Sequence, residues 1–161
     1  MIKGEHHAPI SENAAARAAS AFGTLSITPK CRYEFKDYHH NGNNRNSQWT
    51  INAFDEANLY YEAYSNQIFI VNQKGDRIDA IVDQDSGKLL QLGYPAVTSS
   101  KEYSLYLARF HVNSQSSHGY PVDYMKDNED RPSEKIINFL IEHQKMCKKY
   151  RKRLLQGKKL K

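Results

Sequence analysis

The chain has 161 residues, of which 39% are hydrophobic and 25% charged, a composition that is typical of globular proteins and excludes disorder throughout. This length suffices for one domain with its own core, so we expect a single domain over residues 1–161. The net charge is +5, yet residues 1–144 carry 14 basic against 18 acidic side chains. The remaining nine Lys and Arg lie in residues 145–161, which contain no acidic residue, so the positive charge belongs to the C-terminal element alone.

Membrane and secretory classes find no support in the sequence. No stretch approaches the ~18–20 apolar residues that span a bilayer, and Glu5-His6-His7 interrupts any apolar signal core. Cys31 and Cys147 show no metal-binding spacing, and we expect two thiols in a reducing compartment, with one long-range disulfide as the alternative. The sequence therefore predicts a cytoplasmic protein.

The N-terminal part predicts a helix followed by a strand. Residues 1–9 look loose, and Ser11 then caps an alanine-rich helix over about 12–21. From Cys31 to Tyr38 apolar and charged residues alternate, which is typical of a strand with one buried face.

The next segments mix a loop with less certain elements. The polar run 39–47, with four Asn and a Gly, predicts a surface loop. Trp49, Ile51 and Phe54 indicate another strand, whereas 55–64 fits a helix or a strand equally well.

The second half predicts a sheet and a terminal helix. Residues 67–94 read as an antiparallel meander with glycine turns. We favour a strand at about 104–112 over a helix, and a long ordered loop over 113–131. Pro132 then begins a long amphipathic helix, with a break near His143 as an alternative, and residues 156–161 form a frayed basic end.

These elements predict an α+β fold. An antiparallel sheet of about five or six strands, with a central meander, is expected between a short N-terminal helix and a long basic C-terminal helix. The order of the strands does not follow from the sequence.

The strongest concentration of reactive side chains lies between His111 and Arg131. Two histidines beside a cation are what metal-independent RNA cleavage requires: one accepts the 2′-hydroxyl proton and the other protonates the leaving oxygen. The candidate catalytic residues are His111, His118, Tyr120, Lys126 and Arg131. The competing interpretation is that His111 is a half-buried strand residue and His118 a loop residue.

Two metal-dependent patterns are weaker. Glu34 and Lys36 match the E-x-K end of a metal-dependent nuclease pattern, but no suitable acidic residue precedes them, and alternating charges on a wet strand face explain them better. Residues 83–87 open like a calcium loop but have Gly at the fifth position, so we interpret them as a hairpin turn. We expect neither a metal nor a cofactor.

The basic C-terminus predicts contact with phosphates, which gives salt-sensitive and largely sequence-independent affinity. The candidate nucleic-acid-binding residues are Lys145, Lys148, Lys149, Arg151, Lys152 and Arg153.

Together these features predict a small basic protein that associates with nucleic acid, RNA more than DNA. Within that class the specific hypothesis is a metal-independent ribonuclease of the toxin kind, and a binding module without catalysis, which uses the basic C-terminus and Tyr rings, stays open. The alternative is a non-enzymatic factor, such as a phage or bacterial accessory protein or an inhibitor, that docks on a protein partner through a Tyr-rich sheet face.

Overall fold

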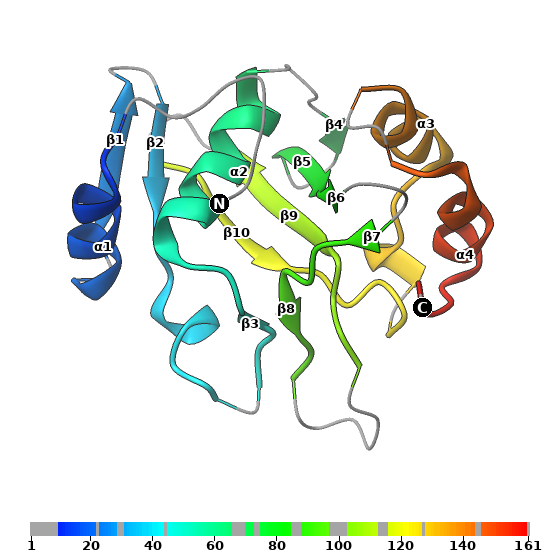
Figure 1. Ribbon diagram of the computed structural model, residues 1–161, viewed down its shortest axis with the longest axis horizontal. Helices are drawn as coiled ribbons and strands as arrows, with labels where there is room; N and C mark the ends of the chain where they lie inside the picture. The colour runs from blue at the N-terminus through cyan, green and yellow to red at the C-terminus, as the bar shows by residue number, and fades with distance from the viewer. Residues whose placement is uncertain are drawn as a thin grey trace.

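The computed structural model describes residues 10–21, 23–28, 31–43, 45–65, 70–72, 75–84, 88–96, 103–112, 116–126, 128–143 and 146–160. Helices and antiparallel strands make an α+β fold, as expected (Figure 1). Residues 1–9, residues 85–87, for which a turn is expected, and Lys145 lie outside the described ranges.

The N-terminal helix α1, Glu12–Ser20, matches the expected one. The hydroxyl of Ser11 accepts a hydrogen bond from the Ala14 N–H at 3.1 Å and so caps the first turn. A hairpin follows, in which β1, Thr24–Thr28, pairs with β2, Cys31–Glu34. The expected alternation holds, because Cys31 and Tyr33 are buried while Arg32 is exposed.

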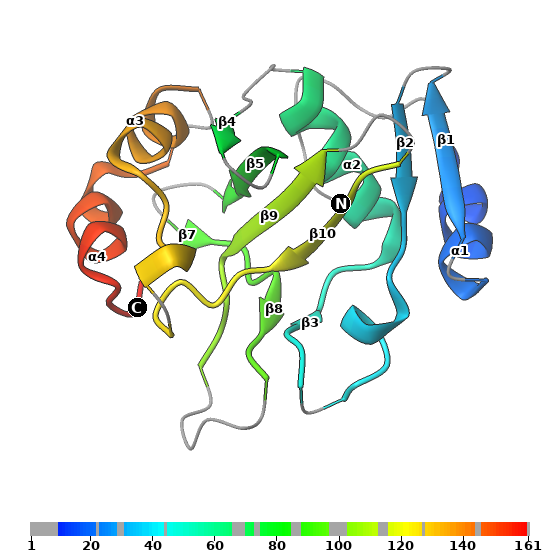
Figure 2. The same ribbon diagram turned by 180° about the vertical axis from the view of Figure 1, so that it is seen from behind.

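The segment with two interpretations is a helix, α2, Ala53–Ser65, whose first turn is capped by Asn52 Oδ1 accepting from the Asp55 N–H at 2.8 Å. It lies across one face of the central sheet, in front of β9 and β10 in Figure 1 and behind them in Figure 2. The strand expected around Trp49 to Phe54 is correspondingly short: β3 covers Gln48–Trp49 only, and Phe54 belongs to α2.

The central sheet has four strands in the order β10–β9–β5–β4, all antiparallel, rather than the five or six expected. Their bounds are β4 Ile70–Asn72, β5 Gly75–Ile81, β9 Leu107–Val112 and β10 His118–Pro121. The expected meander is only partly correct, because β5 pairs with β9 along its length instead of with the next strand in sequence. Strands β6, Asp83–Gln84, and β7, Lys88–Leu89, pair with each other, and β8, Gly93–Tyr94, pairs with β3.

Residues 113–131 are not one long loop. They contain β10 and a 3-10 turn, η2, Asn128–Asp130. Gly119 and Pro121 suggest a turn in sequence, but here Gly119 lets β10 pass close to Phe110: a Cβ at Gly119 would lie 2.1 Å from Phe110 Cδ1. Close backbone approach, and not a turn, explains this glycine.

The single long C-terminal helix is wrong, and the break considered as its alternative is present. Helix α3, Glu134–His143, is followed by a 3-10 turn, η3, Lys148–Tyr150, and a short helix, α4, Arg151–Gln156. Gly157, at φ 64°, ends α4. Residues 157–160 are packed and not frayed, since Leu160 is buried and the Tyr124 hydroxyl donates to the Lys158 carbonyl at 2.7 Å.

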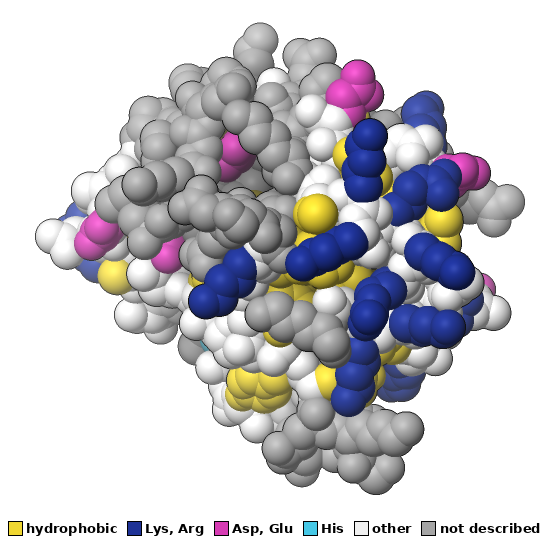
Figure 3. Space-filling model, turned by 45° about the vertical axis from the view of Figure 1, so that its right-hand side comes forward, with side chains coloured by type: hydrophobic (Ala, Val, Ile, Leu, Met, Phe, Trp, Pro, Cys, Tyr) yellow, Lys and Arg dark blue, Asp and Glu magenta, His cyan; other side chains and the backbone are white. Residues whose placement is uncertain are grey.

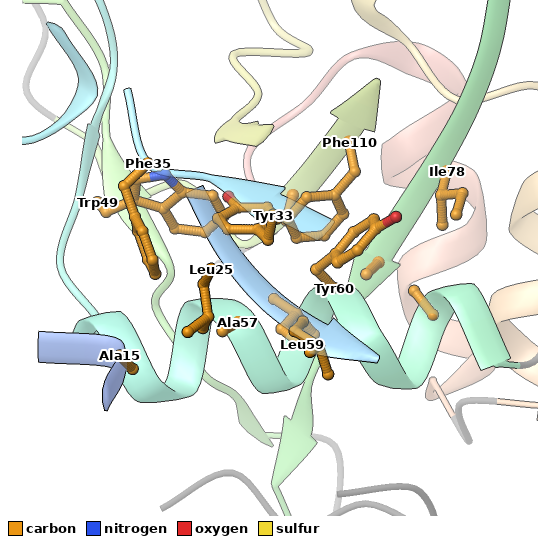
Figure 4. Packing of buried hydrophobic residues seen from close by; sticks show 14 of the residues in the cluster. Ala15, Leu25, Tyr33, Phe35, Trp49, Ala57, Leu59, Tyr60, Ile78 and Phe110 are labelled. Carbon is orange, nitrogen blue, oxygen red and sulfur yellow. The ribbon is translucent and has the colours of Figure 1, made fainter. Parts of the chain in front are cut away.

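Two hydrophobic cores lie on opposite faces of the sheet. The first joins α1, α2 and the β1–β2 hairpin to Ile78 and Phe110, with the rings of Tyr33 and Tyr60 5.1 Å apart at its centre (Figure 4). The second packs α3 and α4 against Ile81, Leu107 and Val122. Cys31 and Cys147 are not joined by a disulfide. Within the described ranges no helix is both long and apolar enough to cross a membrane.

Candidate active site

One half of a sheet face is polar. Side chains alternate along a strand. The residues of β5, β9 and β10 that alternate with those of the first core therefore all point to the opposite face, which carries the second core. There the second core covers one end, and two cross-strand rows of polar residues occupy the rest. These rows are Asp79, Arg109 and Tyr120, and Arg77, His111 and His118. Figure 2 shows β9 and β10 from this side, with α3 and α4 beside them.

The structure brings His111 and His118 together. They are directly opposite each other in the β9–β10 register, and their ring centroids are 5.5 Å apart with an interplanar angle of 34°. Both side chains are half-buried. His118 was expected in a loop, but its place in β10 holds it more firmly than a loop would.

Two further aromatic rings lie beside the histidine pair on this face. Tyr120 stacks on His111 at 5.7 Å, and its hydroxyl lies 3.4 Å from His111 Nε2. On its other side Tyr120 stacks on His39 at 5.3 Å and 16°. His39 Nδ1 donates to the Ser47 carbonyl at 2.8 Å, which leaves Nε2 without the proton in the neutral ring, and burial lowers the pKa of His39.

Two charges from β2 and its extension flank His118. A parallel bridge between Tyr33 and Ser117, with the Glu34 N–H donating to the Ser117 carbonyl at 2.7 Å, brings Glu34 alongside the start of β10. Lys36 Nζ lies 3.0 Å from Glu34 Oε1, and this contact lowers the pKa of Glu34. Burial first, then the fields of His111 and Lys36, lower the pKa of His118, while Glu34 opposes the shift.

A buried ion pair supports the other row. Arg109 Nε and Nη2 bind the two oxygens of Asp79 at 2.9 and 3.2 Å, and Arg109 also binds the side chain and the carbonyl of Asp130 at 3.2 and 2.9 Å. Asp79 is fully buried, and Arg77 approaches it at 3.6 Å. Arg77 pairs with His111 across the strands, and its Nε is buried without a hydrogen-bond partner among the described residues. A cation with unused donor capacity therefore adjoins the histidine pair.

A pocket of about 290 Å³ opens beside Tyr120 and His39. It is bordered by the loop that runs from His39 to Ser47, by β10 and by the segment that follows β10. Lys126, one of the expected catalytic residues, lines this pocket together with Tyr120. Arg131, another, lies against Gly157 at the end of α4.

The basic residues of the C-terminus form a separate surface on η3 and α4. Figure 3 brings the α3–α4 side forward and shows Lys and Arg gathered across it. Lys148, Lys149 and Lys152 are exposed. Arg151 binds Glu134 and Asn138, and Arg153 donates to the Lys159 carbonyl at 2.8 Å, so both arginines also hold the fold together.

Sequence reasoning missed several members of this site. Glu34 and Lys36 were interpreted as a wet strand face, but both are partly buried and lie beside His118. His39 was assigned to a surface loop, yet it is 7% exposed. Arg77 and Asp79 alternate with Ile78 and Ala80, a pattern that would have predicted a polar face on this strand.

Comparisons with known proteins add no assignment. No protein-family model matches the chain, and neither the curated proteins nor the solved structures searched yield a match. Among the described residues there is no group of three or more His, Cys, Asp or Glu side chains that could hold a metal ion.

Proposed function

We propose that the protein is a ribonuclease of the toxin kind that cleaves RNA without a metal ion. One observation carries the proposal: His111 and His118 face each other across β9 and β10, between Lys36 on one side and Arg77 on the other. Two imidazoles supply the proton acceptor and donor of a transphosphorylation, and the two cations favour the phosphate and the charge that builds on it.

His118 suits the role of general base. Its lowered pKa keeps the ring neutral at neutral pH, so it can accept the proton of the ribose 2′-hydroxyl. The 2′-oxygen then bonds to phosphorus as the bond from phosphorus to the 5′-oxygen breaks, and protonated His111 gives its proton to that leaving oxygen. The products are a 2′,3′-cyclic phosphate and a 5′-hydroxyl, and no further reactant is required.

The basic surface on η3 and α4 serves binding in this proposal. Lys148, Lys149 and Lys152 are exposed and lie within five residues of the chain, which suits contact with neighbouring phosphates of a strand. Such contacts favour any nucleic acid, whereas the chemistry at the histidines demands a 2′-hydroxyl. The proposal therefore separates binding, which includes DNA, from cleavage, which is restricted to RNA.

The test uses three labelled oligonucleotides in EDTA: all-RNA, all-DNA, and an RNA with 2′-deoxyribose at the cleavage site mapped on the first. We expect cleavage of the RNA alone, with a 2′,3′-cyclic phosphate end. Cleavage of DNA, or activity only with added Mg²⁺, would contradict the proposal. If the protein bound neither nucleic acid, a protein partner would be favoured instead. Tyr38 and Tyr94, the large hydrophobic side chains exposed in the described part of the chain, would then be candidate contacts.

A further inference from the structure

One residue that lines the pocket beside Tyr120 carries an unpaired carboxylate oxygen. Asp123 lines the pocket, and its Oδ2 accepts a hydrogen bond from the Tyr103 hydroxyl at 2.6 Å. Its Oδ1 is buried and has no hydrogen-bond partner in the described part of the chain. A buried acceptor without a donor is costly, so this oxygen suits a ligand that supplies one.

Other residues that line the pocket offer donors. Arg45 and Asn46 belong to the loop after His39 and line the pocket. Asn43 holds this loop in shape, since its Oδ1 accepts from the backbone N–H groups of Arg45 and Asn46 at 2.8 and 2.9 Å. The pocket therefore combines an acceptor-only group, nitrogen donors and the aromatic rings of His39 and Tyr120.

We propose that this pocket binds guanine, as the base of the nucleotide whose 2′-hydroxyl reacts, an inference that rests on the proposed ribonuclease function. Guanine is the RNA base whose Watson–Crick edge presents two adjacent donors, N1–H and N2–H, to a carboxylate such as Asp123. Adenine and cytosine place a ring acceptor there, and uracil flanks its one N–H with carbonyls. The O6 and N7 acceptors of guanine meet the donors of Arg45 and Asn46.

The position of the pocket matches this role. Tyr120 lines the pocket and also stacks on His111, so one nucleotide can occupy the pocket with its base and reach the histidine pair with its sugar and phosphate. Lys126, which also lines the pocket, supplies a further cation for the phosphate.

The test compares the wild-type protein on the dinucleotides GpU, ApU, CpU and UpU, and measures calorimetrically the binding of guanosine and uridine 2′-monophosphate. We expect kcat/KM to be at least about 30-fold higher for GpU, since an unpaired buried acceptor rejects the other bases by about this factor. Cleavage without base preference, together with equal binding of both nucleotides, would overturn the guanine pocket and leave the ribonuclease intact. Preferential binding of the guanosine nucleotide without cleavage would support the pocket and overturn the ribonuclease, and neither binding nor cleavage would overturn both.

A variant then locates the preference. Asp123→Asn replaces one acceptor oxygen with a donor, so within this variant kcat/KM for GpU should fall to about the value for UpU, and the preference for GpU should be lost. Asp55→Asn, on α2 and the far side of the sheet, makes the same change in charge and should leave the preference unchanged. A GpU preference that survives Asp123→Asn in a folded protein would overturn the assignment.

Discussion

The histidine pair derives its properties from the residues that surround it in three dimensions. Opposing effects act on His118. Burial and nearby positive charge disfavour its protonated form, whereas Glu34 favours it. The balance leaves its pKa below the ordinary value for histidine. This arrangement suits a base that must be neutral when the substrate arrives.

The pH profile of kcat/KM tests this balance directly. Its acid limb should report protonation of His118 and should lie below the ordinary pKa of histidine. Lys36→Met removes a positive charge that disfavours protonated His118, so its pKa rises and the limb moves to higher pH. Glu34→Gln removes a negative charge that favours protonation, so the limb moves to lower pH. Limbs that shift in the same direction in both variants, or in neither, would contradict the assignment of His118 as the base.

The strands β9 and β10 are the elements that hold the site. Their register sets His118 opposite His111, and the other face of the same two strands packs into the first core. The geometry of the site therefore depends on how closely β10 can approach the core behind it.

Gly119→Ala should disturb both stability and activity. The new Cβ would lie 2.1 Å from Phe110 Cδ1 and 2.9 Å from the Arg109 carbonyl, so β10 must move outward, at an expected cost of about 1–3 kcal/mol. Urea unfolding measures this loss. RNA cleavage should fall as well, because His118 directly precedes Gly119 and would move with β10. Gly23→Ala is the matched control, since its nearest neighbour would lie at 3.8 Å. Equal stability of the two variants would show that β10 does not need this close approach.

The ion pair of Arg109 and Asp79 should be important for the stability of the sheet. Arg109→Met leaves the fully buried Asp79 without its main partner, which we expect to cost about 3–5 kcal/mol in urea unfolding at neutral pH. The double change Asp79→Leu with Arg109→Met removes both charges and should recover most of that loss. If Arg109→Met were as stable as the wild type, the ion pair would not be important for the stability of the sheet.

Sequence patterns predicted some elements well and others poorly, for identifiable reasons. Ser11 and the alanines that follow it predicted α1 correctly, because capping and helix propensity act locally. The pairing of β5 with β9 and the bridge from Tyr33 to Ser117 join residues far apart in the chain, which no local pattern records. Strand β10 was missed because it is short and contains Gly119 and Pro121, two residues that usually mark turns.

For the candidate site too, local features could be predicted from the sequence and long-range contacts could not. His111 and His118 could be selected from their chemistry and spacing, but Lys36, Arg77 and His39 enter the site only through contacts between distant segments. The assignment of Arg131 rested on proximity in sequence, and the structure places it against Gly157.

At the scale of the whole molecule, the basic C-terminus and the site are neighbours. Lys159 lies over the ring of Tyr103 at 6.0 Å, and Tyr103 binds Asp123 at the pocket. Under the proposed function, an RNA strand bound at η3 and α4 would therefore pass near the pocket as well. Because Tyr150, Leu154 and Leu160 belong to the second core, removing the C-terminus would unfold the protein, and substitution is the sound way to test it.

Neutralising three exposed lysines should weaken binding and its dependence on salt. Lys148, Lys149 and Lys152 changed together to Gln should lower the slope of log K against log salt for single-stranded RNA by up to about 2, at about 0.7 per lost phosphate contact. Arg151 and Arg153 stay, since they also bind the fold. A control with the same charge change is Arg17, Arg32 and Lys88 to Gln, all exposed and outside this surface. Equal salt slopes for the two triple variants would remove the C-terminus from the binding site.

The most direct measurement of the central claim is single-turnover cleavage of RNA in EDTA by the wild type and by His111→Asn and His118→Asn, each first shown to be folded by thermal unfolding. Asparagine preserves size and hydrogen bonding but cannot carry the proton, so we expect each variant to lose about 10²–10⁴-fold in rate while binding RNA as tightly as the wild type. Added imidazole should restore part of the rate to the matching alanine variants. Cleavage by both asparagine variants at the wild-type rate would show that the histidine pair is not catalytic.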